Sequence, residues 1–281
     1  MSRIVRRQFT ILGCGSSGGV PRADGDWGAC DPSDPRNRRR RCSLLVRQWS
    51  GEGDDPMAAT TLVIDTSPDF REQAIDAKLA RLDAIVFSHD HADQAHGIDD
   101  VRAFAIRRRK AIATYFDAPT GATLTSRFAY CFFGQGGYPA ILDAQPEIEP
   151  GSPFNVSGPG GDIPILPIAQ DHGGSVSLGF RIGDFAYCND VVDLNEAALD
   201  ALDGVDVLVV DALRYAPHPT HAHLAKALDW IRRVRPQRAI LTNMHVDLDF
   251  SRVAAETPAH VEPAVDGLIV ETTLEIYPAQ R

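Results

Sequence analysis

The sequence predicts a single α/β domain over residues 1–281, and three observations support this fold class. First, short apolar runs rich in β-branched residues alternate with helical patterns, as in sheets covered by helices. Second, 281 residues of which 44% are hydrophobic suffice for one large core, and no internal repeat or linker interrupts them. Third, most apolar runs end in His, Asp or Asn, which is typical of strand ends that line one crevice.

The first half of the chain is expected to contain five strands and three helices. The strands are residues 3–12, 42–48, 60–64, 84–87 and 113–116, and the helices are residues 69–78, 99–110 and 120–130. Asp69 is the expected N-cap of the first helix. Residues 131–161 are rich in Gly and Pro and are expected to form an insertion or a lid loop.

The second half is expected to be richer in strands. The strands are residues 163–168, 176–182, 185–188, 207–210, 239–241, 267–270 and 272–276. Gly183-Asp184 is a two-residue hairpin signal between two of them. One helix is expected over residues 195–202, and another from Leu224, with Leu228, Ile231 and Val234 on the same apolar face.

Residues 13–19 match the pattern GxGxxG after a strand, which is found in dinucleotide-binding folds. In those folds the glycine loop opens a helix. Here residues 20–28 are full of helix breakers instead. We therefore interpret the segment as a permissive backbone loop that lines the site.

The bulk composition excludes several classes of partner. The net charge of -10 argues against general binding to nucleic acid or to an anionic membrane surface. No stretch is long enough for a membrane span, and the apolar run at residues 9–12 is too short for a signal peptide. The five cysteines form no CxxC pair, so neither a disulfide framework nor a zinc knuckle is indicated, and a cytoplasmic location is expected.

The densest cluster of reactive side chains follows the apolar run at residues 84–87. His89, His91, Asp93 and His96 stand within a few residues of one another at this strand end. Imidazoles and a carboxylate in this pattern suit zinc, manganese or iron. A solvated polar loop is the alternative, but such loops rarely concentrate three histidines.

Other strand ends carry side chains of the same kind. They are Asp65, His172, Asp190, Asp211 and Asn243. One crevice that collects ligands from several loops explains this distribution. A divalent ion bound there would lower the pKa of its water to about 7 and supply hydroxide at neutral pH. A second ion or a cationic histidine would stabilise charge on the substrate.

The order of these motifs resembles the metallo-β-lactamase superfamily over nearly the whole chain. Within it the sequence is most similar to the PhnP-like branch of phosphoribosyl cyclic phosphate phosphodiesterases. The resemblance is carried by residues 13–21, 41–43, Asp65, 88–93, His172, Asp190, 220–221 and 241–243. It implies a four-layer αββα sandwich with metal ions at one edge.

The resemblance also implies roles for individual residues. His89, His91 and His172 would hold the first metal, with Asp190 bridging and Asp93 on the second metal. His221 would contact the phosphate or protonate the leaving oxygen, and with Asp190 it is the expected catalytic pair. The role of His221 also follows from the residue itself, because a histidine at a helix start with a near-neutral pKa suits general acid catalysis.

The sequence departs from the superfamily pattern at two expected metal ligands. Gln94 and Asn243 stand where the superfamily usually has histidine. An amide oxygen is a weaker and harder ligand, so we expect one tight site and one weaker site, for zinc or manganese. His96 and His245 lie two residues away and either replace these ligands or support the site from outside it, like Asp65 and Asp211.

A third departure concerns the cysteine cluster that binds a structural zinc in PhnP itself. Only Cys30 and Cys42 remain in that loop. No structural zinc is therefore expected.

The predicted function is a metal-dependent hydrolase, most consistent with a phosphodiesterase for small cyclic or diester phosphates, such as a cyclic phosphate or nucleotide. Arg41, Arg71 and Arg102 are available to hold phosphate. A mono-iron oxidoreductase of the same fold is one alternative. A degenerate member that binds nucleotide or metal without turnover is another, motivated by Gln94 and Asn243.

Overall fold

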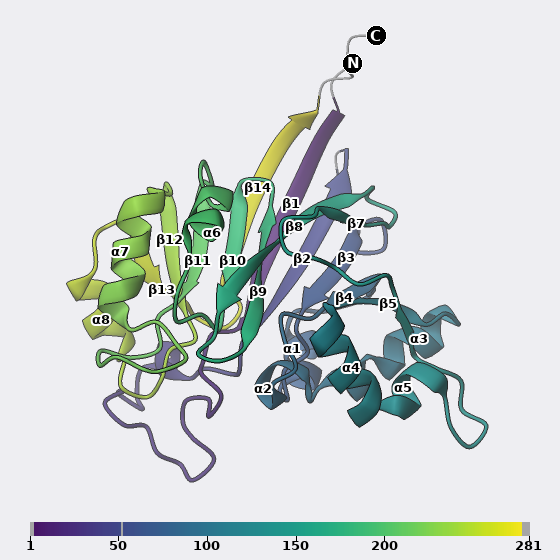
Figure 1. Ribbon diagram of the computed structural model, residues 1–281, viewed down its shortest axis with the longest axis horizontal. Helices are drawn as coiled ribbons and strands as arrows, with labels where there is room; N and C mark the ends of the chain where they lie inside the picture. Colours follow the sequence, from purple (N-terminus) through teal and green to yellow (C-terminus); the bar gives the residue numbers. More distant parts are fainter. Residues whose placement is uncertain (1–2, 52, 277–281) are drawn as a thin grey trace.

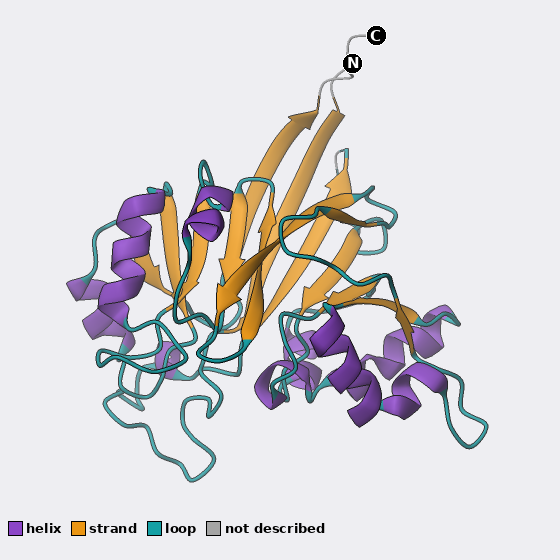
Figure 2. Ribbon diagram, viewed as in Figure 1, coloured by secondary structure: helices purple, strands orange, loops and turns teal. Residues whose placement is uncertain are grey.

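Two β-sheets lie face to face between two groups of helices (Figures 1 and 2). The computed structural model describes residues 3–51 and 53–276. Within that part of the chain each sheet has seven strands. The layers therefore run helix, sheet, sheet, helix, which confirms the predicted α/β sandwich.

The first sheet is built from the N-terminal half and closed by the last strand. Its order is β14-β1-β2-β3-β4-β5-β6. The strands are β1 (Arg3–Gly13), β2 (Ser43–Ser50), β3 (Thr60–Ile64), β4 (Ala84–Val86), β5 (Ile112–Tyr115), β6 (Leu142–Ala144) and β14 (Ile269–Ile276). Strands β3 to β6 are parallel, so their carboxyl ends lie at the same edge.

The second sheet is built from the rest of the chain. Its order is β13-β12-β11-β10-β9-β8-β7. The strands are β7 (Phe154–Val156), β8 (Ile163–Asp171), β9 (Val176–Ile182), β10 (Phe185–Cys188), β11 (Val207–Asp211), β12 (Arg238–Thr242) and β13 (Val261–Pro263). Strands β10 to β13 are parallel, and Figure 2 shows loops gathered at the edge where these strands end.

Short helices cover the outer faces of both sheets. Against the first sheet lie α1 (Phe70–Asp76), α2 (Ala92–Ala95), α3 (Arg102–Arg108), α4 (Ala118–Arg127) and α5 (Ala129–Phe133), while α6 (Glu196–Ala201), α7 (Leu224–Val234) and α8 (Phe250–Glu256) accompany the second. Two 3-10 turns, η1 (Pro35–Asn37) and η2 (Ile98–Val101), complete the described elements. No helix in residues 3–51 and 53–276 is long and apolar enough to cross a membrane.

The four layers follow from the two-residue period of a strand. Leu62 and Ile64 of β3 pack into the core between the sheets, whereas Val63 packs into the core beneath the helices. Because both faces are covered, the strand reads as a continuous apolar run rather than as an alternating one. Phe9 and Phe185 join the two sheets, with ring centroids 3.8 Å apart and nearly parallel planes.

Most predicted strands and helices are confirmed, with small shifts at their ends. The hairpin at residues 183–184 is present, and no helix follows the glycine loop. That loop is held by close backbone contact instead. A Cβ at Gly13 would lie 2.1 Å from the carbonyl oxygen of Arg41. This explains glycine at that position without any nucleotide.

The prediction of a lid over residues 131–161 is wrong. The segment supplies β6 and β7, which form the edges of the two sheets. Three-residue strands are too short to show an alternating pattern, so the Gly and Pro content dominated the prediction. The strands expected at 267–270 and 272–276 are one continuous edge strand, and α8 and β13 were not predicted.

The predicted N-cap at Asp69 is also only partly right. Asp69 occupies the position before α1, but its side chain makes no capping bond. It accepts a hydrogen bond from the backbone N–H of Arg41 and pairs with the guanidinium of the same residue, at 2.9 Å each. The carboxylate therefore ties α1 to the loop before β2.

Replacing Phe9 by Ala is expected to lower the free energy of unfolding by about 3–5 kcal/mol, because it opens a cavity between the sheets. Chemical denaturation would measure the loss. Ile4→Ala on the same strand is the control, since Ile4 is 45% exposed. Its expected cost is below about 1 kcal/mol. Equal losses for the two variants would contradict this account of the core.

Candidate metal centre

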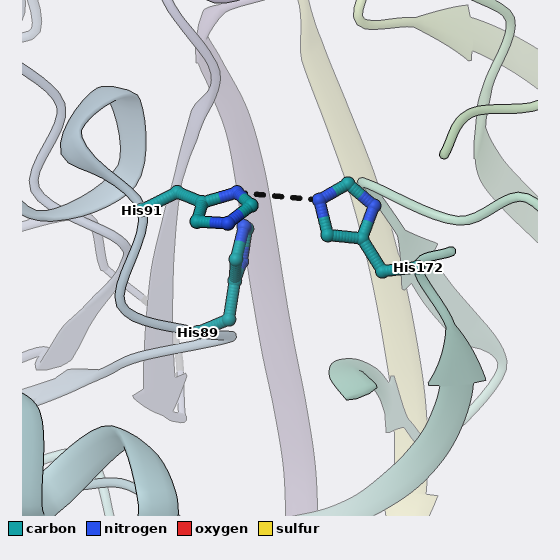
Figure 3. Close-up of side chains that lie close together, drawn as sticks. All are labelled: His89, His91 and His172. Atoms are coloured by element: carbon teal, nitrogen blue, oxygen red, sulfur yellow. Dashed lines mark hydrogen bonds between the residues drawn. The ribbon is translucent and has the colours of Figure 1, made fainter. Parts of the chain in front are cut away.

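Three imidazoles from two sheets converge at the edge where the parallel strands end (Figure 3). His89 follows β4, His91 precedes α2 and His172 follows β8. One ring nitrogen from each lies within 4.8 Å of the others. These residues therefore lie together as predicted, although His172 is more than eighty positions away from His89 and His91 in the chain.

The orientation of His89 is set by a relay of hydrogen bonds. The carboxylate of Asp65 accepts from the backbone N–H of Ser88 at 2.8 Å and from its hydroxyl at 2.7 Å. Because that hydroxyl proton is used, Ser88 Oγ accepts from His89 Nδ1, 3.0 Å away. The lone pair of His89 is therefore on Nε2, which is buried without a hydrogen-bond partner.

A backbone carbonyl group fixes the tautomer of His172 in the same way. Its Nδ1 lies 2.8 Å from the carbonyl oxygen of Thr220 and must donate to it, which leaves the lone pair on Nε2. Burial, followed by the nearby charge of His221, lowers the pKa of His172 to about 4. Burial also lowers the pKa of His89. Both rings are thus neutral near pH 7, as metal ligands must be.

The spacing of the imidazoles fits a small divalent ion. His172 Nε2 lies 3.3 Å from His91 Nδ1. Two nitrogens bound to a tetrahedral zinc at 2.0–2.1 Å would be about 3.4 Å apart. Because His172 Nε2 carries no proton, His91 Nδ1 is the donor in this contact, and a metal ion would take the place of that proton. The unpartnered Nε2 of His89 is the third potential ligand atom of this group.

Asp190 lies beside the imidazoles and is surrounded by carboxamides. Its Oδ2 accepts from Gln94 Nε2 at 2.8 Å and from Asn189 Nδ2 at 2.7 Å, while Asn243 Nδ2 lies 3.3 Å from its Oδ1. Burial and the charge of Asp93 raise the pKa of Asp190. One oxygen of Asp190 also groups with nitrogens of His172 and His221 within 4.8 Å.

His221 lies at the edge of the cluster on a buried carboxylate. Its Nδ1 donates to Asp211 Oδ2 at 2.8 Å, and Asp211 also accepts from the backbone N–H of Val191 at 3.1 Å. Burial opposes a charge on His221, but Asp211 outweighs it, with help from Asp190 and Asp93. The pKa of His221 is raised to about 9. A protonated imidazole therefore stands next to neutral ones.

Three polar residues after strands adopt a left-handed backbone. Asp65, Asp190 and Asn243 have φ values of 61°, 53° and 60°. Asp and Asn tolerate this conformation better than other residues with a side chain, but it still costs about 1–3 kcal/mol when the neighbourhood enforces it. The turn redirects each side chain from the strand into the edge of the sandwich, where the histidines are.

Several residues predicted for the site lie outside the imidazole group. Asp93 is near enough to affect the charge of Asp190 and His221 but belongs to neither group of converging ligand atoms. His96 packs edge-on against Phe128. His245 contacts Arg22 and Asp247 instead.

The three arginines predicted to hold phosphate are engaged elsewhere. Each forms an ion pair with a carboxylate close by: Arg41 with Asp69, Arg71 with Glu72 and Arg102 with Asp99. The two groups of potential metal ligands in the described residues contain no cysteine, and Cys30 and Cys42 are buried thiols.

Three contributors to the centre were not assigned from the sequence. Ser88 orients His89, Asn189 donates to Asp190, and the ring of His218 lies 5.2 Å from that of His221. Ser88 and Asn189 each stand directly before a predicted ligand, and this position at a strand end was the available signal.

A depression of about 530 Å³ borders His89. Its other walls come from the start of α4, through Asp117 and Thr120, and from the turn between β8 and β9, through Asp171 and Ser175. Of the three converging imidazoles, only that of His89 lines the depression.

Comparison with known proteins agrees with this geometry. Residues 60–244 match the family described as the beta-lactamase superfamily domain. A solved diphosphatase of the PhnP family is 31% identical, with a TM-score of 0.85 and coverage of 97% of this chain and 100% of that one. Zinc-bound PqqB from Methylobacterium extorquens, at 14% identity, shares the fold with a TM-score of 0.69 over 94% and 99% of the two chains.

One curated relative is much longer than this chain. A protein named octanoyltransferase from Porphyromonas gingivalis is 30% identical over 261 residues, which are 92% of this chain and 50% of that protein. The chain thus spans about half the length of the curated relative that it matches.

The chain belongs to the β-lactamase superfamily and, within it, to the PhnP family. The fold family consists of metal-dependent hydrolases, which implies a divalent metal ion. The three converging imidazoles are a suitable donor set for that ion.

Replacing Ser88 by Ala is expected to weaken metal binding by about 10–100-fold, because His89 loses the bond that fixes its tautomer. Competition with a chromophoric chelator would measure the affinity. Ser152→Ala, in the exposed turn before β7, is the control and should bind metal like the wild type. Unchanged affinity in Ser88→Ala would show that the relay does not orient the ligand.

Proposed function

We propose that this protein is a metal-dependent phosphodiesterase that hydrolyses small cyclic or diester phosphates. The observation that carries the proposal is the convergence of His89, His91 and His172 beside His221, a histidine held on a buried carboxylate. The first three offer lone pairs to an ion, and the fourth offers a proton to a leaving group. Similarity to a PhnP-family diphosphatase supports a small phosphate-containing substrate.

The side chains divide the work as follows. A divalent ion on the three imidazoles would polarise a phosphoryl oxygen and lower the pKa of a water molecule. Asp190 is placed to orient a ligand of that ion, because one of its oxygens lies among the nitrogens of His172 and His221. Asp211 holds the Nδ1 proton of His221 and directs the other ring nitrogen away from itself.

His221 is the proposed general acid. A leaving alkoxide needs a proton as the P–O bond breaks, and a protonated imidazole is well suited to supply it. The same proton provides a positive charge near a phosphate before the reaction, which helps because the three predicted arginines are paired elsewhere.

The two alternatives from the sequence have less support. An iron oxidoreductase of the facial-triad type uses two histidines and one carboxylate. His172, His221 and Asp190 make such a set, but His221 is protonated beside Asp211 and offers no lone pair to iron. A binding protein without turnover would have no need for the pairing of His221 with Asp211. The octanoyltransferase name describes a protein about twice as long and carries no activity to this chain.

Turnover by the purified protein tests the proposal directly. With zinc or manganese added, we expect hydrolysis of bis(p-nitrophenyl) phosphate and of at least one cyclic nucleotide or dinucleoside diphosphate. Release of nitrophenolate, or formation of nucleoside monophosphate from the nucleotide substrates, would be followed over time. Absence of activity on every phosphodiester and diphosphate would refute the proposal, and oxygen uptake with a thiol by iron-loaded protein would favour the oxidoreductase.

Replacing His221 by Gln is expected to lower kcat for an alkyl phosphodiester by about 10²–10⁴-fold, the usual range for loss of a general acid. The loss should be much smaller with bis(p-nitrophenyl) phosphate, because nitrophenolate leaves without a proton. His260→Gln on an exposed turn is the control and should leave both rates unchanged. Equal losses for the two substrates would assign His221 to substrate binding instead.

A further inference from the structure

We infer that the centre binds a single metal ion, and that the carboxamides of Gln94 and Asn243 satisfy the carboxylates that a second cation would otherwise need to satisfy. The inference rests on the proposed function only in taking the imidazole group to be the place of a divalent ion. It sharpens the expectation of a second, weaker site to an expectation of none.

The amide nitrogen of Gln94 lies between two carboxylates. Gln94 Nε2 is 2.8 Å from Asp190 Oδ2 and 3.3 Å from Asp93 Oδ2. A primary amide carries two N–H groups, so it can give one to each carboxylate. The nitrogen must be the atom that faces them, because an amide oxygen in its place would be repelled. A second cation bridging Asp93 and Asp190 would have to displace this group.

The hydrogen bonds of Asp190 also argue against a second ion. A carboxylate accepts in about four directions. Amide nitrogens of Gln94 and Asn189 take two of them on Oδ2, at 2.8 and 2.7 Å. Asn243 takes a third on Oδ1, at 3.3 Å. Nδ1 of His221 also lies 3.5 Å from Oδ1, but its proton goes to Asp211. One direction remains, which is enough for a single ion but not for a bridge between two.

Asn243 is also oriented as a donor. Its Nδ2 lies 3.1 Å from His221 Nδ1, but that nitrogen carries the proton it gives to Asp211, so Asn243 donates to the carboxylates of Asp190 and Asp211 instead. Its oxygen is 4.0 Å from the buried thiol of Cys42. Turning the amide to offer oxygen to an ion would break the bond to Asp190 and place oxygen against oxygen.

The oxygen of the Gln94 amide does not provide a second metal site either. Gln94 Oε1 is buried and has no hydrogen-bond partner among the described residues. An ion at this oxygen would be separated by the amide itself from the carboxylates that Nε2 holds. Within residues 3–51 and 53–276, the two groups of three potential ligands share His172 and so belong to one centre.

Counting bound zinc tests the inference without reference to activity. The protein would be stripped with a chelator, incubated with excess zinc, desalted and analysed by elemental and native mass spectrometry. We expect one zinc per chain in the wild type. In the double variant Gln94→His/Asn243→His, which replaces both donors by ligands, we expect two. Two zinc ions, or none, in the wild type would overturn the inference.

Gln170→His is the matched control. Gln170 is a buried carboxamide that bonds to Ser177 and to the carbonyl oxygen of Asn189, without contacting Asp190. It should still bind one zinc. If a variant does not fold, as judged by circular dichroism, the wild-type count decides the question.

The failure of this inference is distinct from the failure of the proposed function. One zinc per chain without phosphodiester turnover would uphold the single-ion centre and refute the phosphodiesterase. Turnover by a wild-type protein that binds two zinc ions would do the reverse.

Discussion

The centre depends on one constraint, which is that each of its buried carboxylates must have hydrogen-bond donors. Asp65, Asp190 and Asp211 are almost fully buried at the ends of strands. A buried carboxylate without partners is strongly unfavourable, so each has recruited donors from another part of the chain. Asp65 takes those of Ser88, Asp190 takes three amides, and Asp211 takes the imidazole of His221. The positions of the histidines follow from these bonds.

The loop before β2 meets a similar demand with a guanidinium. Arg39 is buried and donates to the carbonyl oxygen of Leu248 at 2.8 Å and to Asn37 Oδ1 at 3.3 Å. Its Nη1 lies 3.8 Å from the thiol of Cys30 and 3.4 Å from the carbonyl oxygen of His245. The side chain thus ties the N-terminal loop to the loop after β12.

The amide N–H groups bound to Asp190 affect how the centre can work. Amide groups hold Asp190 in place whether or not an ion is bound, so the carboxylate is positioned in advance. The cationic group beside the imidazoles is His221, whose ring lies 4.9 Å from that of His172 and which is held by Asp211.

The sequence by itself determined the elements and the kinds of side chain at their ends. Continuous apolar runs indicated strands such as β3 and β11, because both faces of each sheet are covered. The spacing in residues 89–93 indicated the metal-type donors, since the pattern is local. Three-residue edge strands such as β6 and β7 left no such local pattern and were missed.

Only the tertiary structure decided which atom each group presents. The tautomer of His172 depends on the carbonyl oxygen of Thr220, 48 positions away, and the orientation of the Gln94 amide depends on Asp190, 96 positions away. Gln94 was therefore predicted to offer an oxygen to a metal, whereas the fold presents its nitrogen to a carboxylate. The direction of a hydrogen bond is a property of two partners, and here folding alone brings the partners together.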